Sequence, residues 1–354
     1  MNVKHGLEGV VAAETRLSMV DGERGELVIG GFRVEELAGW RFEDVVELLW
    51  GFAPGRAHPA RASAGWKPAP HSMDALRAGV AALSAHDDRE AATLLLWSCP
   101  AIVAAHRRRS RGLEPVAPRE DLGFAANYLY MLNGSEPHAE LVRGLETYLN
   151  TVVDHGLNAS TFTARVIAST GSDFVSAVTG AIGALKGPLH GGAPGPALDM
   201  VFEIGDASRA EEVLRRKIES GERLMGFGHR VYKVRDPRAD VLAVAAERMF
   251  TRTSGGSADA LDIDMRLYEL ARAVERTALR LLEEYKPGRK LQTNVEFYTA
   301  LLLHGIGLDS ELFTPTFAIS RVAGWIAHCF EQRAVGRLIR PQSVYVGAMP
   351  ALAT

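Results

Sequence analysis

The strongest constraint on the fold is a series of segments with helical periodicity that begins near residue 35. Apolar residues recur at i, i+3, i+4 and i+7 in stretches such as EELAGWRFEDVVELLW, AELVRGLETYLNTVVDHG and MRLYELARAVERTALRLLEEY. This periodicity predicts about a dozen or more helices. Only residues 8–34, which are rich in Gly, Val, Thr and Ile, are compatible with short strands or turns. The sequence therefore predicts a mostly α-helical protein.

Two of these segments, residues 176–186 and 316–329, are apolar on nearly all sides. A helix of that kind is buried inside a large helical body or against a partner subunit. Glycine and proline mark loops at 53–71, 187–196, 226–238 and 252–263. The first and last of these look like plain connections, whereas the middle two carry histidines beside glycines.

Composition excludes several classes of protein. The 354 residues have a formal net charge of −3, so no overall basic field favours nucleic acid or a membrane surface. No apolar stretch reaches the roughly 18 residues of a membrane-spanning helix, and the first residues lack the apolar core of a secretory signal. The two cysteines, Cys99 and Cys329, form neither a disulfide framework nor a zinc spacing. A cytoplasmic setting is expected.

Both histidine-bearing loops have the composition of a binding site. In GPLHGGA, His190 is surrounded by glycines, which let a backbone approach a ligand closely. In GFGHRVYKVRDPR, His229 is followed by Arg230, Lys233, Arg235, Asp236 and Arg238. Arginine grips carboxylates through two parallel hydrogen bonds. The second loop therefore predicts recognition of a small molecule with several negative charges, with a solvated surface loop as the alternative.

Further polar residues stand in apolar surroundings. Arg321, in FAISRVAGW, lies on a helix predicted to be buried and needs an anionic partner there. Arg340 lies in LIRPQS, and DHGLNAST contributes Asp154, His155 and Asn158. A structural interpretation of DHGLNAST is a helix that ends at Gly156, followed by a helix that begins at Asn158. No phosphate-binding loop, H-E-x-x-H pair or G-x-S-x-G sequence occurs.

A single carboxylate, Glu296, lies in LQTNVEFYTALLLH at the start of a predicted helix. Two interpretations are open. Thr293 and Glu296 have the spacing of a capping box, in which Thr293 is the N-cap and Glu296 folds back onto it. Alternatively, Glu296 is a general base that removes a proton next to a carbonyl group. The two roles compete, because a carboxylate bound to its own backbone is held away from substrate.

The motifs GPLHGGA, GFGHRVYKVRDPR, NVEFYTA, FAISRVAGWIAH and RPQS occur in this chain in the order found in the citrate synthase family. The stretches ANYLYMLNG and DHGLNASTFTARV also resemble its bacterial and archaeal dimeric branch. The resemblance implies an all-α fold with a large domain, residues 1–193 and 309–354, and a smaller inserted domain, residues 194–308. It implies a homodimer that converts oxaloacetate and acetyl-CoA into citrate and CoA. It implies neither a permanently bound cofactor nor a metal, with the coenzyme A thioester acting as co-substrate.

The resemblance also implies roles for individual residues. Glu296 takes the position of the base, His190 that of the donor to the thioester oxygen, and His229 that of the residue polarising the ketone. Residues at positions that bind the carboxylates and keto group of oxaloacetate are His155, Arg238, Arg321 and Arg340, the last reaching into the neighbouring subunit. Residues at positions that contact coenzyme A are Met225, Phe227, Gly228, Lys233 and Asn294.

The sequence departs from the family pattern around one site. The usual N-V-D-F-Y-S-G is NVEFYTA here, so Glu296 replaces an aspartate and adds a methylene. Gln292 and Thr293 stand where Tyr-Pro is usual, and Pro194 and Gly195 where Asn-Glu is usual. Three alternatives follow: a citrate synthase, a 2-methylcitrate synthase that uses propionyl-CoA, or a paralogue whose substrate differs or whose turnover is lost.

Overall fold

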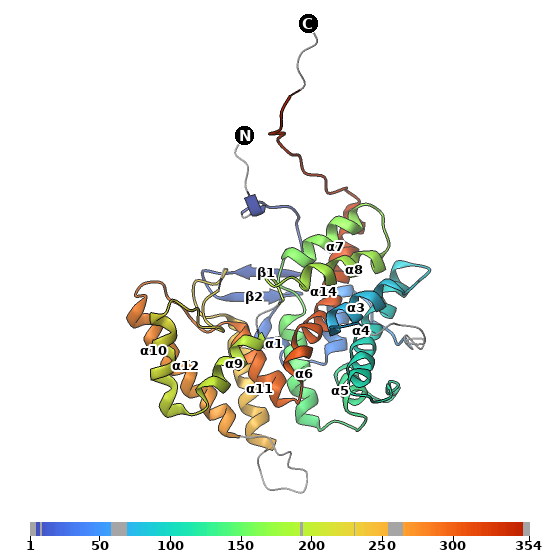
Figure 1. The fold of residues 1–354 in the computed structure, drawn as a ribbon. Coiled ribbons are helices and arrows are strands. Elements are labelled where there is room, and N and C mark those ends of the chain that lie inside the picture. Colours follow the sequence, from blue (N-terminus) through green and yellow to red (C-terminus); the bar gives the residue numbers. More distant parts are fainter. Residues whose placement is uncertain are drawn as a thin grey trace.

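The computed structural model describes residues 5–7, 9–57, 69–191, 194–229, 231–253 and 265–349. Over these residues it contains fourteen α-helices, three short 3₁₀ helices and one small sheet, so the predicted all-α architecture is confirmed (Figure 1). Most of the predicted loops at 53–71 and 252–263 lie outside the described residues, as does Arg230.

The helices of the first half are α1 (Val34–Leu37), α2 (Phe42–Trp50), α3 (Ser72–Ala81), α4 (Asp88–Ser110), α5 (Phe124–Asn133), α6 (Ala139–Val152), α7 (Ala159–Ser169) and α8 (Phe174–Leu185). Those of the second half are α9 (Pro194–Ile204), α10 (Ala210–Glu219), α11 (Pro237–Thr253), α12 (Met265–Tyr285), α13 (Val295–Gly305) and α14 (Phe313–Val335). The 3₁₀ helices are η1 (His5–Leu7), η2 (Ala207–Arg209) and η3 (Ser310–Leu312).

The sheet lies in the N-terminal region that sequence left open between strands and turns. Strands β1 (Ser18–Asp21), β2 (Glu26–Ile29) and β3 (Phe32–Arg33) form an antiparallel meander in that order. The turn between β1 and β2 touches the loop that carries His229, where the Lys233 amide donates to the Gly22 carbonyl at 2.8 Å. A Cβ atom on Gly22 would lie 2.3 Å from the Val231 carbonyl oxygen, so this contact requires glycine.

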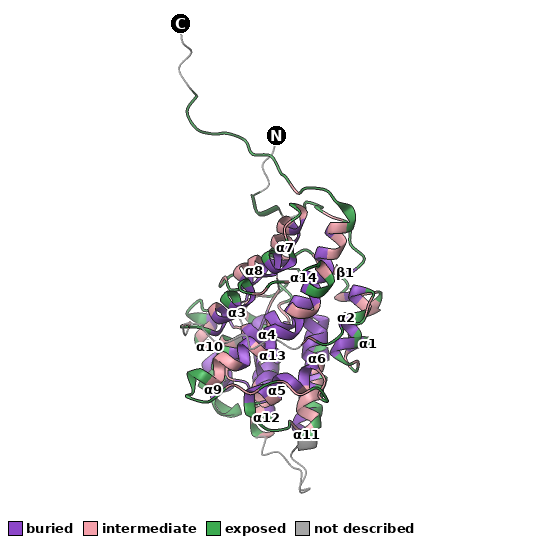
Figure 2. Cartoon of the chain, turned by 90° about the vertical axis from the view of Figure 1, so that its right-hand side faces the viewer, coloured by how far each residue is buried: buried purple, intermediate pink, exposed green. Residues whose placement is uncertain are grey.

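Helix α14 forms the centre of the molecule. It packs against α2, α4, α6, α7 and α8, and most of its residues from Phe313 to Cys329 are buried (Figure 2). The predicted burial of the apolar segment 316–329 is therefore confirmed. Helix α14 approaches the end of α6 so closely that a Cβ atom on Gly324 would lie 2.2 Å from the Val153 carbonyl oxygen.

Helices α9 to α12 gather on one side of the molecule (Figure 1). Helix α11 packs against both α6 and α13 and so connects this group with the helices around α14. The predicted small domain, residues 194–308, begins where α9 begins and ends just after α13. This division of the chain stays a prediction.

Of the two helix boundaries predicted in DHGLNAST, one differs from the structure and one is confirmed. Helix α6 ends at Val152 with Val153 as its C-cap, and Gly156 lies in the following loop with a φ of 62°. The predicted helix start at Asn158 is confirmed, because its side chain accepts from the Thr161 amide.

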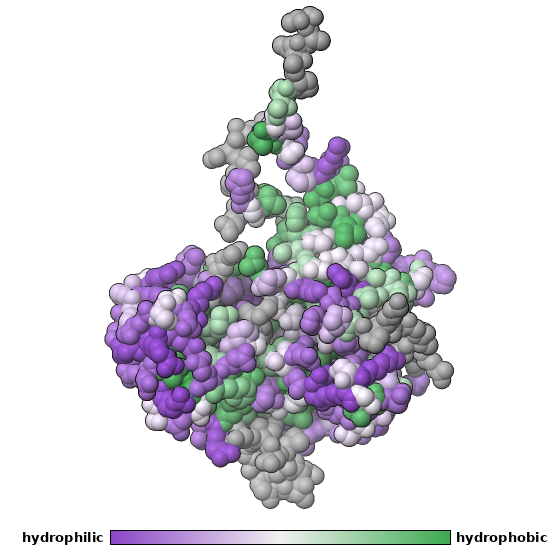
Figure 3. All heavy atoms as spheres, viewed as in Figure 1, coloured by the Kyte–Doolittle hydropathy of each residue, from purple (hydrophilic) through white to green (hydrophobic). Residues whose placement is uncertain are grey.

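Beyond α14 the chain leaves the body of the protein (Figure 1). Helix α14 ends at Gly336 with a φ of 64°, and nearly all the described residues that follow are exposed. Exposed apolar residues of this end include Val335 and Leu338, and apolar side chains gather near it on the molecular surface (Figure 3). Within the described residues, every helix is too short or too polar to cross a membrane.

Candidate active site

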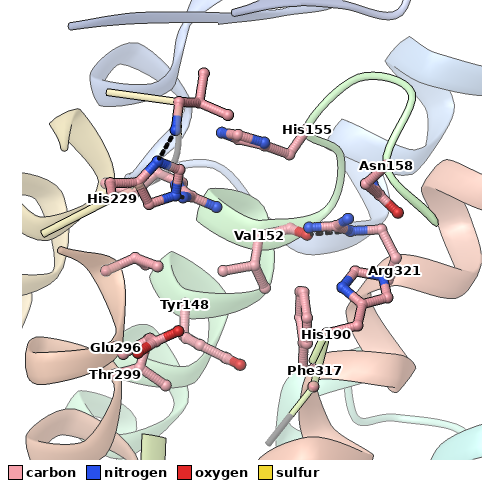
Figure 4. A pocket seen from close by; sticks show the side chains of 14 residues that line it. Tyr148, Val152, His155, Asn158, His190, His229, Glu296, Thr299, Phe317 and Arg321 are labelled. Carbon is pink, nitrogen blue, oxygen red and sulfur yellow. Dashed lines mark hydrogen bonds between the residues drawn. The ribbon is translucent and has the colours of Figure 1, made fainter. Parts of the chain in front are cut away.

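The loops that carry the histidines converge on one cavity of about 210 Å³ with α6, α13 and α14 (Figure 4). Seven residues singled out from the sequence line it: His155, Asn158, His190, His229, Arg238, Glu296 and Arg321. The remaining lining residues are Tyr148, Val152, Gly191, Val231, Val295, Thr299 and Phe317. Residues separated by more than 150 positions in the chain thus share one wall.

Arg238 is 5% exposed and is held by Asp236. Its Nε and Nη2 atoms donate to the two carboxylate oxygens of Asp236 at 3.0 and 2.9 Å. Asp236 is 1% exposed and also accepts from the Val295 amide at 3.2 Å. The salt bridge therefore fixes the guanidinium of Arg238 beside the first residue of α13.

The tautomer of His229 follows from its neighbours. Its Nδ1 atom accepts from the backbone amides of Val231 and Tyr232 at 3.0 and 3.1 Å. Because amide nitrogens only donate, the proton of the neutral ring lies on Nε2. Burial, together with the Arg238 charge, lowers the pKa of His229 to about 4. His229 is therefore a neutral hydrogen-bond donor at physiological pH.

His155 lies in the loop between α6 and α7. Its Nε2 atom lies 3.0 Å from the Tyr232 hydroxyl. The rings of His155 and His229 meet edge to face, with centroids 6.1 Å apart. Burial lowers the pKa of His155 well below its usual value, and the charges of Arg238 and Arg321 act in the same direction. The cavity wall therefore also presents His155 in its neutral form.

Arg321, on α14, is 2% exposed. Its Nε atom donates to the Val152 carbonyl at 2.8 Å, and its guanidinium lies 4.6 Å from the centre of the Phe317 ring. Within the described residues, no carboxylate lies at salt-bridge distance from it. Burial lowers the pKa of Arg321 to about 10, so it stays cationic at physiological pH. Its remaining N–H groups can bind an anion in the cavity.

His190 lies opposite Glu296 in the cavity (Figure 4). Its Nε2 atom lies 2.8 Å from the Ser160 hydroxyl. Ser160 also accepts from the Trp325 indole at 3.1 Å and donates to Oδ1 of Asn158 at 2.8 Å. Burial lowers the pKa of His190 to about 4, with a contribution from the Arg321 charge. When the single Ser160 hydroxyl proton turns from Asn158 to Nε2, the neutral ring presents its Nδ1–H group to the cavity.

Glu296 is the second residue of α13, whose N-cap is Asn294. The Asn294 Oδ1 atom accepts from the Glu296 amide at 3.0 Å, whereas the Thr293 hydroxyl donates to Glu275 at 2.7 Å. The capping box between Thr293 and Glu296 is therefore wrong. Both Asn and Thr are good N-caps, and the buried acceptor on Glu275 takes the Thr293 hydroxyl away from the helix start.

The carboxylate of Glu296 points into the cavity near Tyr148 and Thr299 (Figure 4). Among the described residues it has no hydrogen-bond partner. Burial raises its pKa above the usual value, although the positive charges of Arg238 and Arg223 oppose this shift. A desolvated carboxylate without a partner is a stronger base than one that is solvated or paired.

The residues predicted to contact coenzyme A lie beside the cavity rather than in its lining. Asn294 joins α13 to the loop at 225–228, because its amide donates to Gly226 and its side chain to the Gly228 carbonyl, both at 2.9 Å. Phe227 bridges to Thr293. Met225 is partly buried next to them, and Lys233 is exposed. Arg340 lies in the exposed C-terminal segment, outside the residues that line the cavity.

Sequence reasoning missed three residues of this site. Tyr148 and Phe317 look like ordinary apolar positions of amphipathic helices, so only the structure shows that they face the cavity. Ser160 looks like an ordinary first-turn residue of the helix that begins at Asn158, although it contacts His190. In the part of the chain that is described, no cluster of His, Cys, Asp or Glu is arranged to hold a metal ion.

Comparisons with known proteins show the family of this chain. The family model "Citrate synthase, C-terminal domain" matches residues 6–342. The chain is 41% identical to a citrate synthase of Haloferax volcanii, covering 98% of this chain and 96% of the relative. It is 39% identical to a 2-methylcitrate synthase of Mycobacterium tuberculosis, covering 98% and 91%.

A solved structure shares the same fold. It is a ternary complex of citrate synthase from Thermoplasma acidophilum with carboxymethyl coenzyme A and oxaloacetate, with a TM-score of 0.84 and 28% identity over 100% of this chain and 98% of that one. Both the sequence similarity and the structural similarity extend over at least 98% of this chain. The chain belongs to the citrate synthase family.

Proposed function

We propose that this protein condenses acetyl-CoA with oxaloacetate to give citrate and CoA. The observation that carries the proposal is the cavity itself, where the unpaired carboxylate of Glu296 and neutral His190 face two buried arginines. The arginines bind a dicarboxylate, and the carboxylate and imidazole perform acid–base chemistry. One cavity thus holds both halves of a carbon–carbon bond-forming reaction.

Oxaloacetate binds at the arginine side of the cavity. Arg321 has free N–H groups for one carboxylate, and Arg238 contributes to binding the other beside His155. His229 directs its Nε2–H group at the keto oxygen. Because the three histidines are neutral, the positive charge of the pocket comes from the arginines and favours a dianion.

Glu296 starts the chemistry by taking a proton from the methyl group of acetyl-CoA. The electron pair of that C–H bond moves onto the thioester oxygen, where His190 Nδ1–H stabilises the resulting enolate. The raised pKa of Glu296 brings it closer to that of the very weak carbon acid. Glu296 and His190 therefore act on the same substrate from the two sides of the cavity.

The enolate carbon then attacks the keto carbon of oxaloacetate. A carbon–carbon bond forms, the keto oxygen takes a proton from His229, and citryl-CoA results. Water then cleaves the thioester, which releases citrate and the thiol of CoA. Closure of the domain formed by residues 194–308 excludes water until citryl-CoA has formed.

Coenzyme A binds along the loop beside the cavity. Met225, Phe227 and Gly228 form its cradle, and the hydrogen bond from Asn294 to Gly228 ties this cradle to the helix that carries Glu296. Lys233 is exposed and available to a phosphate. Binding of the thioester and positioning of the base are thereby linked.

We further propose that the protein acts as a homodimer in the cytoplasm. Arg340 lies in a C-terminal segment that extends away from the helical body (Figure 1). In the dimer it completes the dicarboxylate site of the neighbouring subunit. The exposed Val335 and Leu338 at the base of this segment are covered in the dimer. The buried free thiols of Cys99 and Cys329 suit a reducing compartment.

A second acyl substrate is favoured by the 39% identity with a 2-methylcitrate synthase. The test measures thiol release with oxaloacetate and either acetyl-CoA or propionyl-CoA. The proposal expects a higher kcat/KM with acetyl-CoA. A preference for propionyl-CoA identifies a 2-methylcitrate synthase, and binding of oxaloacetate without thiol release from either thioester overturns the enzymatic proposal.

A further inference from the structure

A hydrogen-bond network of buried polar side chains lies outside the cavity lining. Asp154, Arg165 and His328 are each at most 1% exposed, and none of them lines the cavity. They connect α14 and α7 with the loop that carries His155, and Ser18 of β1 is the fourth residue of the network. The proposed chemistry leaves all four residues without a role.

The direction of each hydrogen bond that His328 makes in this network follows from its partners. Nη1 of Arg165 lies 3.0 Å from Nδ1 of His328, and a guanidinium can only donate. Nδ1 therefore accepts, and the ring proton lies on Nε2. That atom lies 3.2 and 3.3 Å from the two oxygens of Asp154. His328 is thus held in one tautomer as a donor to Asp154.

At its other end, this hydrogen-bond network holds Gly156, the residue that follows His155 in the sequence. The Ser18 hydroxyl donates to Asp154 Oδ2 at 2.5 Å and accepts from the Gly156 amide at 2.8 Å. Asp154 and Gly156 are the two neighbours of His155 in the sequence. Both are therefore fixed by one network, and the position of His155 between them is set from outside the cavity.

The negative charge of Asp154 is buried without a cation in contact among the described residues. Burial raises the pKa of Asp154, but His328, Arg321 and Ser18 lower it, and the pKa falls below its usual value. Well-packed apolar residues often stabilise a protein as well as a buried polar network does. A role in the geometry of the neighbouring pocket accounts for keeping this arrangement.

We propose that Asp154 and His328 are positioning residues that hold His155 at the cavity wall for binding of the 2-oxo acid. The inference rests on the proposed function, because it assigns His155 to oxaloacetate. Loss of either residue releases the segment 154–156 without touching Glu296 or His190. The effect is therefore expected on the KM for oxaloacetate and not on the KM for the acyl-CoA.

The test compares three variants by steady-state kinetics and by calorimetric binding of oxaloacetate. Asp154→Asn and His328→Leu are each expected to raise the KM for oxaloacetate about 10- to 100-fold, since small displacements of positioning groups have effects of that order. His328→Gln is expected to restore most of the affinity, because its amide can donate to Asp154 and accept from Arg165.

The three variants separate the effect of charge on oxaloacetate binding from the effect of geometry. Asp154→Asn removes a negative charge near an anion site, and the loss of Coulomb repulsion alone would tighten oxaloacetate binding. His328→Leu keeps that charge. Weaker binding in both supports positioning. The control is Tyr128→Phe, which removes a buried hydrogen bond of 3.0 Å to Thr316 of α14 outside the cavity and is expected to leave both KM values unchanged.

The outcomes distinguish this inference from the proposed function. A wild-type protein that neither binds oxaloacetate nor releases thiol overturns both. An active wild type with an unchanged KM for oxaloacetate in Asp154→Asn and His328→Leu overturns the positioning role alone. So does a result in which activity follows thermal stability, with the leucine variant more active than the glutamine variant.

Discussion

The Nε2 atom of His229 lies 3.3 Å from Nη2 of Arg238, and both atoms carry hydrogen. The backbone amides on Nδ1 of His229 leave its proton on Nε2, so the two groups cannot bond to each other. Two donors that face each other favour an acceptor that binds both, such as the keto oxygen of oxaloacetate as it gains negative charge during attack.

Replacing His229 therefore removes a donor to the developing alkoxide. His229→Gln is expected to lower kcat about 10²- to 10³-fold, the usual effect of losing one such donor, as measured by thiol release at saturating substrates. His304→Gln is the matched control, because His304 is a partly buried histidine that does not line the cavity. Equal rates in the two variants would contradict the role of His229.

Glu296 is expected to be essential as a base. Glu296→Gln should lower kcat by about 10²- to 10⁴-fold while oxaloacetate still binds, as calorimetry would show. Glu296→Asp shortens the side chain, and the Asn294 cap holds the start of α13 in place, so the backbone cannot compensate. A loss of about 100-fold is expected. A gain in rate with aspartate would instead show a pocket degraded from the family pattern.

The acid limb of the pH–rate profile is expected to follow Glu296. Its pKa is raised by burial, and protonation removes the base, so kcat falls as pH decreases through that pKa. His190 and His229, whose pKa values are about 4, stay neutral over this range. Activity is measured at each pH with circular dichroism as a check of folding. An acid limb that persists unchanged in the residual activity of Glu296→Gln would assign it to another group.

Ser160 is expected to control the proton on His190. Only when its hydroxyl donates to Nε2 does the ring present Nδ1–H to the thioester oxygen. Ser160→Ala removes that donor and frees the other tautomer, so kcat should fall about 10-fold or more while the KM for oxaloacetate changes little. Thr163→Ala, which removes a hydroxyl from the same helix at the exposed side, should retain activity. Comparable losses in both variants would argue for a general effect on α7.

Mixing two inactive variants tests whether Arg340 acts across subunits. In a dimer of Glu296→Gln with Arg340→Ala, one site receives both Glu296 and the partner's arginine if the tail crosses over. Equal amounts mixed through unfolding and refolding should recover about a quarter of wild-type activity, since half of the dimers are mixed and each has one intact site. Recovery of no activity would show that Arg340 serves its own chain, and full activity of Arg340→Ala alone would show that it serves no site.

The sequence predicted most of the site because its chemistry depends on rare residues in unusual surroundings. Arg321 in an apolar helix and His190 among glycines attract notice wherever they lie, and both face the cavity. Tyr148 and Phe317 could not be found in this way, because an aromatic residue on the inner face of a helix fits core packing equally well. Their role depends on which helices meet, and helical periodicity carries no such information.

Helix boundaries show the same limit on a smaller scale. Thr293 and Asn294 are adjacent and both suit an N-cap, and the choice between them depends on Glu275, which comes from α12. Local sequence cannot reveal an acceptor that arrives from a distant helix. Glu296 lines the cavity, and the capping box that the local pattern suggested is not formed.

The contact between Gly324 and the Val153 carbonyl oxygen determines how much sequence change the centre of the molecule can tolerate. A side chain of any size at residue 324 would push α14, and Arg321 with it, away from the loop of His155. In a library of random variants selected for activity, Gly324 should therefore be as intolerant of substitution as Glu296. A residue that contributes no atom to the reaction would then be indistinguishable, by mutational tolerance alone, from the residue that starts it.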